Sequence, residues 1–348
     1  MPKIISVATR VGVGKGGIST ALIGYSNSSA MKSVPLVLVA SHEEGKLIKS
    51  FFSSFFFILR SCEKNDAVWF HCGPWFSMLR KFILSVVVRF KRGRVFYHIH
   101  SPKMADYILN GKYNWLLNIF FKSSDGIMVL TPWWKDLLLN KYPYLSGKIE
   151  IAPNPLDHNF MAIAHERTNN SERKNIKILS MARLVEGKGF SSVIDAMTIM
   201  PDNFSLTIAG DGPLMSSLKN KVYKLGLDDR VSFTGWINYE KKSELYLNHD
   251  LFCLTSKYDS FGMGYLEAMA CGLPVVALAY QAIPDVVPDS LAGVLINDDD
   301  IYSIKKAIEI CVKNRARMSL FAKKHVVESF DAEVISSRVI SFMGCNNE

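Results

Sequence analysis

The sequence predicts an α/β protein built from two domains, each with a doubly wound parallel sheet. Its 348 residues are enough for two domains of ordinary size. Hydrophobic residues make up 49% and charged residues 21% of the chain, which is typical of a globular protein and excludes a disordered one. Short apolar segments alternate with longer stretches that can form helices, and this alternation is typical of a parallel sheet.

The first half of the chain holds six strand-like segments. The first is followed by a glycine-rich turn from Gly12 to Gly17, and Ile18 to Tyr25 can begin a helix. The six segments are Lys3 to Thr9, Val34 to Ala40, Ala67 to His71, Arg94 to His100, Gly126 to Leu130 and Ile149 to Ala152.

A polar stretch from Met161 to Asn175 interrupts this pattern and has the composition of an inter-domain linker. The alternation then restarts with Lys177 to Met181, Ser205 to Ala209, Val231 to Thr234, Asp250 to Leu254, Val275 to Ala277 and Gly293 to Ile296. We therefore expect an N-terminal domain over residues 1–165 and a C-terminal domain over 166–329. Two such domains bind ligands in the cleft between the carboxyl ends of their sheets.

Charge divides unevenly between the halves. Residues 1–165 hold 20 Lys and Arg against 9 Asp and Glu, a net charge of +11, whereas residues 166–348 carry a net charge of −2. A basic half suggests an anionic partner, such as nucleic acid, a phospholipid surface or a phosphorylated substrate. Phe51 to Arg60 and Arg80 to Arg94 combine cations with bulky apolar residues. They are either packed helices with solvated cations or a surface that docks on an anionic membrane.

The six cysteines lack Cys-x-x-Cys and zinc-ligand spacing, so we expect reduced thiols in a cytoplasmic protein. The N-terminus lacks the apolar stretch of a signal peptide. The longest apolar runs, Phe55 to Leu59 and Phe82 to Val88, are too short to span a bilayer.

Two motifs need a choice between interpretations. Gly12 to Gly17 matches the dinucleotide fingerprint Gly-x-Gly-x-x-Gly, but no acid ends the second strand to bind an NAD ribose. A turn that binds phosphate at a helix N-terminus and a turn needed only for packing both remain possible. Asp298 to Asp300 could form a metal-binding cluster, but its place before Ile301 to Val312 favours a helix N-cap.

The most specific segment runs from Tyr258 to Ala277. Asp259 and Glu267 lie eight positions apart, and between them the small-residue loop from Ser260 to Gly264 opens a helix. Such a loop presents backbone N–H groups to a phosphate, while the two carboxylates can accept hydrogen bonds from hydroxyl groups. In chemical terms this is a site for a nucleotide sugar.

This segment resembles the Glu-x7-Glu signature of retaining glycosyltransferases with the GT-B fold, family 4 or group 1, although Asp259 stands where that family has Glu. Four more stretches resemble motifs of the same family in the same order: Ile151 to Asp157, Ala182 to Gly189, Ala209 to Pro213 and Val231 to Gly235. Phe330 to Glu333 resembles the family's tail motif, with Ala332 in place of the usual Trp.

The resemblance implies two Rossmann-like domains facing across a cleft, with residues 330–348 forming a helix that crosses back to the first domain. Arg183 and Lys188 are then catalytic, because a guanidinium and an ammonium stabilise a departing nucleoside diphosphate. His100 contacts the transferred sugar, with His98 as a packed neighbour, and Asp259 contacts the sugar as well. Glu267 accepts the ribose hydroxyls. The remaining donor-binding residues are Gly16, Gly17, Gly210, Trp236, Phe261, Gly262 and Met263.

The predicted function is transfer of a hexose from a UDP- or GDP-sugar, with retention, to a growing lipid-linked bacterial glycan of the O-antigen, capsule or lipopolysaccharide type. We expect no metal, no cofactor and no nucleic acid partner, and a peripheral position on the inner face of the cytoplasmic membrane. Two alternatives stay open: an NAD-dependent nucleotide-sugar epimerase or dehydrogenase, and a non-catalytic nucleotide- or nucleic-acid-binding module. The missing ribose acid counts against the first, and the second does not account for the segment from Asp259 to Ala277.

Overall fold

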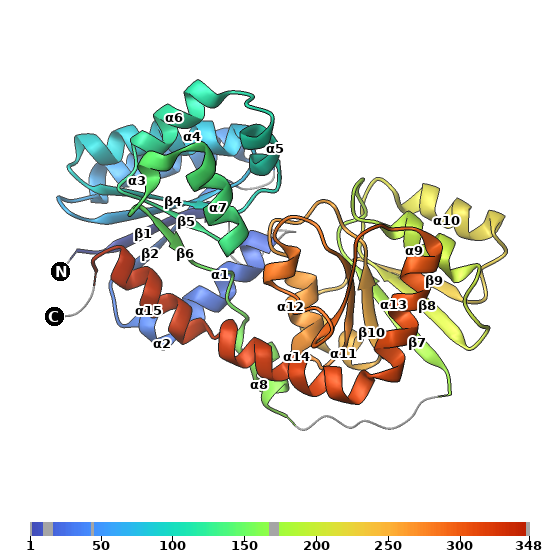
Figure 1. Ribbon diagram of the computed structural model, residues 1–348. Coiled ribbons are helices and arrows are strands. Elements are labelled where there is room, and N and C mark those ends of the chain that lie inside the picture. The colour runs from blue at the N-terminus through green and yellow to red at the C-terminus, as the bar shows by residue number, and fades with distance from the viewer. Residues whose placement is uncertain (1, 10–16, 43–44, 167–173, 346–348) are drawn as a thin grey trace. The chain divides into compact units, whose positions relative to one another are not determined.

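The computed structural model describes residues 2–9, 17–42, 45–166 and 174–345. The chain divides into two compact units. Unit 1 comprises Met1–His158 and Phe330–Glu348, and unit 2 comprises Asn159–Ser329 (Figure 1). The sequence had suggested a boundary at residue 165, seven residues further along the chain than this division.

Unit 1 contains a parallel six-stranded sheet in the order β2-β1-β3-β4-β5-β6. Its strands are β1 (Ile4–Thr9), β2 (Leu36–His42), β3 (Ala67–Cys72), β4 (Arg94–Ile99), β5 (Gly126–Val129) and β6 (Ile149–Ile151). All six strands expected from the sequence are confirmed. The second begins two residues later than expected, after Pro35, which has no N–H to donate to a ladder.

Helices cover both faces of this sheet (Figure 1). One face carries α3 (Leu47–Ser61), α4 (Trp75–Phe90), α5 (Lys103–Leu109), α6 (Asn114–Lys122), α7 (Pro132–Lys141) and the 3-10 turn η1 (Pro143–Leu145). The other face carries α1 (Gly17–Asn27), α2 (Ser29–Lys32) and α15 (Ala332–Phe342). This is the arrangement that right-handed crossovers from β1 to β2 and from β2 onward produce.

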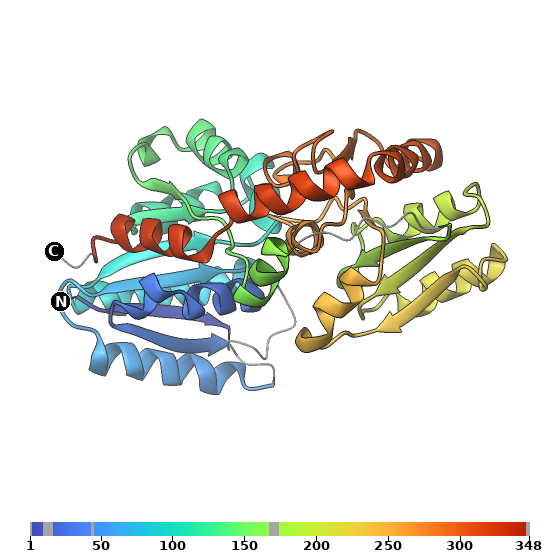
Figure 2. The ribbon, with the colours of Figure 1, turned by 90° about the horizontal axis from the view of Figure 1, so that it is seen from below.

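The C-terminal helix α15 returns to unit 1, as the resemblance implied (Figure 2). Ile335 and Val339 are buried in the same core cluster as Trp69. The Glu333 carboxylate accepts hydrogen bonds from the backbone N–H groups of Ser29 and Ala30. The acid of the tail motif therefore also caps the N-terminus of α2, because it accepts hydrogen bonds from N–H groups that have no partner within that helix.

Unit 2 contains a second parallel six-stranded sheet, in the order β12-β11-β10-β7-β8-β9. Its strands are β7 (Ile176–Met181), β8 (Phe204–Ala209), β9 (Val231–Gly235), β10 (Leu251–Leu254), β11 (Val275–Leu278) and β12 (Gly293–Ile296), again at the expected places. Its helices are α8 (His158–His165), α9 (Phe190–Met197), α10 (Met215–Lys224), α11 (Tyr239–Leu247), α12 (Met263–Ala270), α13 (Ile301–Lys313) and α14 (Arg315–Ser329), with the 3-10 turn η2 (Ile283–Asp285).

Helix α8 corrects the position of the expected linker, because Met161 to His165 are helical. Phe160 is buried with its ring 5.8 Å from that of Tyr246. The Lys323 ammonium donates to the carbonyl oxygens of Ile163 and Glu166. Two buried positions on α8, Phe160 and Ala164, were too few for the sequence pattern to reveal a helix.

Three expectations about single features can be checked in the described residues. All six cysteines are buried free thiols, as expected. Asp300 is the N-cap of α13, because its carboxylate accepts the N–H groups of Tyr302 and Ser303, which confirms the interpretation as a cap. Within the described ranges, no helix combines the length and the apolar character that crossing a bilayer requires.

Candidate active site

In unit 2, the predicted site residues lie on loops that follow neighbouring strands. Strands β10, β7, β8 and β9 are adjacent and parallel, so the loops after them meet at one edge of the sheet. The Lys257 N–H donates to the Gly187 carbonyl at 2.7 Å, and the Leu184 N–H donates to the Asp211 carbonyl at 2.9 Å. The loops after β10, β7 and β8 are therefore tied together by their backbones.

Lys188 and Asp259, predicted separately as catalytic, form an ion pair. The Lys188 Nζ lies 2.6 Å from Asp259 Oδ1 and 2.9 Å from the Tyr258 carbonyl oxygen. Their side chains are only 12% and 17% exposed, so water screens this pair less than a surface pair. Arg183 follows the same strand β7 and is exposed. The loop thus presents one anchored cation and one exposed cation.

Helix α12 begins at a sharp glycine turn, as expected. Gly262, its N-cap residue, has φ +85°, and a Cβ there would lie 2.3 Å from the Tyr265 ring. Phe261 is buried beside it, and Met263 is the first helical residue. Only glycine fits this turn, which leaves the first N–H groups of α12 available to an anion.

The turn after β8 imposes a similar restriction. Gly210 has φ +132°, and a Cβ there would lie 2.0 Å from the Ala182 carbonyl oxygen. A side chain at this position would separate the loops after β7 and β8, so glycine is required for their close approach.

Glu267 is buried inside unit 2 with both carboxylate oxygens engaged. Oε1 accepts a hydrogen bond from Lys242 Nζ at 2.6 Å, and Oε2 accepts one from the Tyr246 hydroxyl at 2.9 Å. Burial and the neighbouring Glu267 charge raise the pKa of Tyr246 well above its ordinary value, so this phenol stays a donor. The sequence had singled out neither Lys242 nor Tyr246, because no local spacing links them to Glu267. A carboxylate oxygen has further lone pairs, so Glu267 keeps the capacity to accept a ligand hydroxyl.

Of three other predicted donor-binding positions, the structure describes two. Trp236 follows β9 with 45% of its surface exposed. Gly17 is the first residue of α1, while Gly16 and most of the glycine-rich turn lie outside the described residues.

In unit 1, His100 lies among three histidines at the carboxyl ends of β3 and β4. His71 pairs with His98 in the sheet register, and His71 Nδ1 lies 3.0 Å from His100 Nε2. His98 Nε2 donates to the Ala152 carbonyl at 2.9 Å, which makes His98 the packed neighbour that the sequence predicted. His71 was missed, although two adjacent predicted strands each ended in histidine and could have indicated the contact.

All three imidazoles are neutral at physiological pH. Burial lowers the pKa of His98 to about 3 and those of His71 and His100 well below 6.5, and the charges of neighbouring groups add to the effect on the last two. Burial also lowers the pKa of the nearby Lys81 to about 8. Neutral imidazoles orient hydrogen bonds without adding charge to a buried site.

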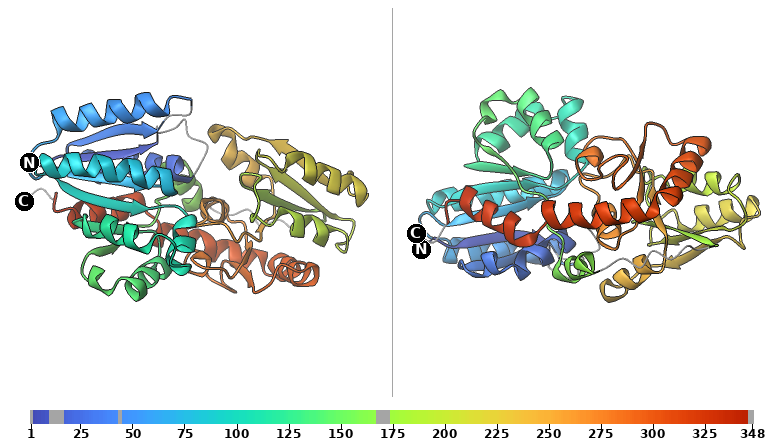
Figure 3. Two further views of the ribbon diagram at one scale, coloured as in Figure 1. Left: turned by 90° about the horizontal axis from the view of Figure 1, so that it is seen from above. Right: turned by 60° about the horizontal axis from the view of Figure 1, so that its bottom comes forward.

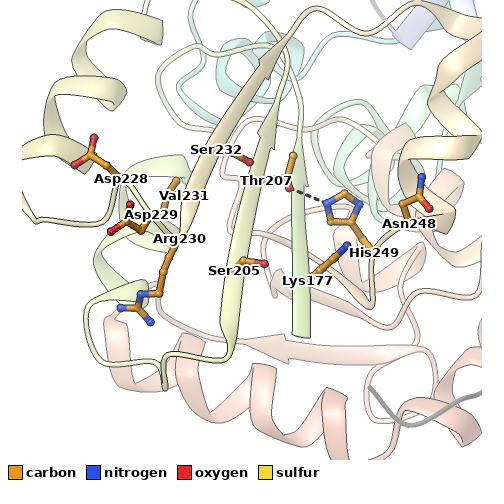
Figure 4. Close-up of a pocket in the computed structure, with 10 residues that line it drawn as sticks. All are labelled: Lys177, Ser205, Thr207, Asp228, Asp229, Arg230, Val231, Ser232, Asn248 and His249. Atoms are coloured by element: carbon orange, nitrogen blue, oxygen red, sulfur yellow. Dashed lines mark hydrogen bonds between the residues drawn. The ribbon is translucent and has the colours of Figure 1, made fainter. Parts of the chain in front are cut away.

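A separate polar pocket of about 250 Å³ opens at the amino ends of β7 to β9 in unit 2 (Figure 4). Lys177, Ser205, Thr207, Arg230 and His249 are among its lining residues, and His249 Nε2 lies 2.8 Å from the Thr207 hydroxyl. The predicted site residues follow the carboxyl ends of the same strands. This pocket is therefore at the opposite edge of the sheet.

Residues 163–325 match the family model described as glycosyl transferases group 1. Unit 2 is a group 1 glycosyltransferase domain. The match contains the Lys188–Asp259 pair, Glu267 and the turns at Gly210 and Gly262.

Similarity to individual proteins agrees with this assignment. The chain is 29% identical over 181 residues to mannosylfructose-phosphate synthase of Agrobacterium fabrum, covering 47% of this chain and 40% of that protein. It is 29% identical over 169 residues to the lipopolysaccharide core biosynthesis glycosyltransferase LpsE of Rhizobium meliloti, covering 48% of this chain and 49% of that protein. The matched region thus spans less than half the length of these relatives.

A solved structure shows that the likeness in fold extends beyond the group 1 domain. Anabaena HepE, solved in complex with UDP and glucose, is 18% identical with a TM-score of 0.76, covering 99% of this chain and 100% of HepE. The chain has the GT-B fold, with its two parallel six-stranded sheets and flanking helices.

Proposed function

We propose that this protein is a retaining hexosyltransferase that moves a hexose from a nucleoside diphosphate sugar to a growing, lipid-linked bacterial glycan. The observation that carries the proposal is the edge of unit 2 where Lys188, Asp259 and the N-terminus of α12 follow adjacent strands. Cations and free N–H groups on neighbouring loops are suited to hold a diphosphate and stabilise it as it departs.

Arg183 and Lys188 stabilise the negative charge that develops on the leaving diphosphate. Asp259 orients the Lys188 ammonium at 2.6 Å and remains close enough to the loop to contact the sugar. Since these cations neutralise the leaving group, the reaction proceeds without a metal ion. The donor phosphate takes the proton of the acceptor hydroxyl, which attacks the same face of the sugar.

The donor is held by Gly210, Phe261, Gly262, Met263 and Glu267, with Trp236 beside the base and His100 of unit 1 at the sugar. HepE, which shares the fold, was crystallised with UDP and with UDP-glucose, and this favours UDP over GDP as the carrier. The HepE complex with UDP-glucose also favours a hexose as the transferred sugar. The glycine-rich turn at Gly16 and Gly17 serves the same donor.

The acceptor domain docks on an anionic membrane through an apolar face on α3 and α4, which lie side by side (Figure 3). This apolar face consists of the exposed residues Ile48, Phe52, Phe56, Phe76, Leu79, Ile83, Val86 and Phe90. Neither helix contains an acid, and the exposed cations Lys49 and Arg60 lie on α3, with Arg92 just after α4. Bulky apolar groups next to exposed cations suit an anionic lipid surface and a lipid-linked acceptor. LpsE acts in lipopolysaccharide core biosynthesis, which supports a glycan of that type.

The decisive experiment incubates the protein with a panel of UDP- and GDP-hexoses and lipid-linked acceptors, and follows donor consumption and anomeric configuration. We expect transfer with retention from a UDP-hexose, at an initial rate that saturating EDTA leaves unchanged. An inverted product, abolition by EDTA with recovery on Mg²⁺ or Mn²⁺, or tight binding of NAD in place of UDP would each contradict the proposal.

A further inference from the structure

Two residues of α11, Lys242 and Tyr246, hold the carboxylate of Glu267 on α12. They stand four positions apart and therefore share one face of α11, which contacts α12. The Lys242 ammonium donates to Oε1 at 2.6 Å, and the Tyr246 hydroxyl donates to Oε2 at 2.9 Å. The contact of the same hydroxyl with the Gly264 carbonyl is longer, at 3.3 Å. Each oxygen of the carboxylate thus has its own donor, and the two donors together fix the orientation of the group.

Burial makes the charge of Glu267 depend on Lys242. The glutamate side chain is 2% exposed, and a carboxylate removed from water needs a cation and hydrogen-bond donors to compensate its charge. Among the described residues, Lys242 is the cation that forms an ion pair with it. The Lys242 side chain is 21% exposed, so the pair extends from the interior of unit 2 towards its surface.

Stabilisation of the fold is the other role that an ion pair of this kind could have. The surroundings of Glu267 oppose it as the whole explanation, because its neighbours Leu266, Ala268 and Met269 on α12 are buried and apolar. A buried ion pair is on average no more stabilising than apolar side chains of similar size. Stability alone therefore does not account for a charged residue in this otherwise apolar helix.

We propose that Lys242 is a positioning residue that, with Tyr246, keeps Glu267 ionised and oriented to accept both hydroxyl groups of a ribose. This inference rests on the proposed function, in which Glu267 binds the donor ribose. A carboxylate can accept about four hydrogen bonds, and the protein supplies one to each oxygen. The remaining capacity is divided between the two oxygens, which suits the neighbouring 2′- and 3′-hydroxyls. The pair thereby determines a preference for ribonucleotides over 2′-deoxyribonucleotides.

The test compares binding of UDP and 2′-deoxy-UDP by isothermal titration calorimetry. We expect the wild type to prefer UDP by roughly 10- to 100-fold, the effect of leaving a charged acceptor without one donor. Lys242→Met should weaken UDP binding by roughly 10-fold and reduce the preference to within about 3-fold, because the carboxylate loses its compensating charge. Lys242→Arg keeps a cation and should retain most of the preference. Lys241→Met, at the adjacent exposed position, is the matched control and should behave as the wild type.

Two further variants separate positioning from stability. Tyr246→Phe keeps the ring that contacts Phe160 and Phe252 and removes the second donor. It should lower the preference for UDP, and it provides the test if Lys242→Met fails to fold. The double variant Lys242→Met/Glu267→Gln should bind UDP no more weakly than Glu267→Gln alone, because Lys242 acts through Glu267.

The outcomes distinguish this inference from the proposed function. A wild-type preference for UDP in both Lys242→Met and Tyr246→Phe, or losses that add in the double variant, would overturn the inference alone. Wild-type protein that binds neither UDP nor GDP would overturn the proposed function and the inference with it. If the wild type binds GDP in place of UDP, GDP and 2′-deoxy-GDP give the same comparison.

Discussion

The two units place their candidate site residues under opposite electrostatic conditions. In unit 2 the residues are charged, paired and partly accessible, as with Lys188 and Asp259. In unit 1 His100 and its two histidine neighbours are neutral and buried. A developing diphosphate charge needs cations that can reach it, whereas a neutral sugar needs only fixed hydrogen-bond directions. The comparison teaches that a charged, partly accessible cluster and a neutral, buried cluster suit different kinds of work, the first electrostatic and the second orienting.

The family match falls on the charged side of this comparison. It covers residues 163–325, which lie entirely in unit 2. The residues of these turns can vary little, because the backbone at Gly210 and Gly262 has no room for a side chain. The hydrogen-bonded cluster in unit 1 depends on strand register and leaves a weaker local signature.

Removing the cation of unit 2 should have the largest effect. Lys188→Ala should lower kcat by about 100-fold or more, because the diphosphate loses a preorganised cation and Asp259 loses its partner. Steady-state kinetics with the preferred nucleotide sugar measure this. Lys257→Ala, which removes an exposed lysine from the neighbouring loop, is the matched control and should stay within about 2-fold. Equal losses in both variants would remove Lys188 from the mechanism.

Neutralising Glu267 should separate donor binding from turnover. Glu267→Gln should weaken UDP binding by roughly 10-fold, since a hydrogen bond from a ribose hydroxyl to a charged acceptor is about 1.5–3 kcal/mol stronger than none. Isothermal titration calorimetry measures the change. The control is Glu244→Gln, an exposed acid on α11. Undiminished affinity in Glu267→Gln would show that this carboxylate serves the fold through Lys242 and Tyr246 alone.

The apolar face of unit 1 should account for membrane binding. The double variant Phe76→Ser/Phe90→Ser should reduce co-sedimentation with phosphatidylglycerol vesicles by roughly 10-fold, because two largely exposed rings no longer enter the lipid. Replacing two exposed apolar residues of unit 2, Tyr302 and Leu320, by serine provides the control. Wild-type binding that is equal for neutral and anionic vesicles would exclude a role for the cations.

The last prediction concerns pH and stability. The folded pKa values of His71, His98 and His100 lie below the unfolded value of 6.5, so the unfolded chain binds more protons as pH falls below 6.5. Their contribution is therefore fully present above pH 6.5 and is lost below it, at about 1.4 kcal/mol per pH unit for each histidine. His98→Gln keeps an N–H for the Ala152 carbonyl. It should lower the slope of the free energy of unfolding against pH by the contribution of one histidine. Urea denaturation between pH 6.5 and 4.5 checks this, and an unaltered slope would contradict neutral burial of His98.

The sequence by itself determined the architecture and pointed to the charged residues of the candidate site. Apolar runs separated by helical stretches are local features, and they located the strands of both sheets to within about two residues. Asp259 and Glu267 were singled out by their spacing around a small-residue loop that opens a helix, whereas Lys188 was predicted from a resemblance to a family motif. Asp300 was identified as a cap from its position immediately before a helix.

Only the tertiary structure decided which side chains meet. His71 reaches His100 across 29 residues because β3 and β4 pair in a particular register, and Lys242 reaches Glu267 across 25 residues because α11 packs beside α12. The same holds for α8, whose second half, from Met161, the sequence assigned to a linker and whose Phe160 packs against Tyr246. Contacts of this kind depend on strand register and helix packing, which the whole core fixes together and which no short stretch of sequence contains.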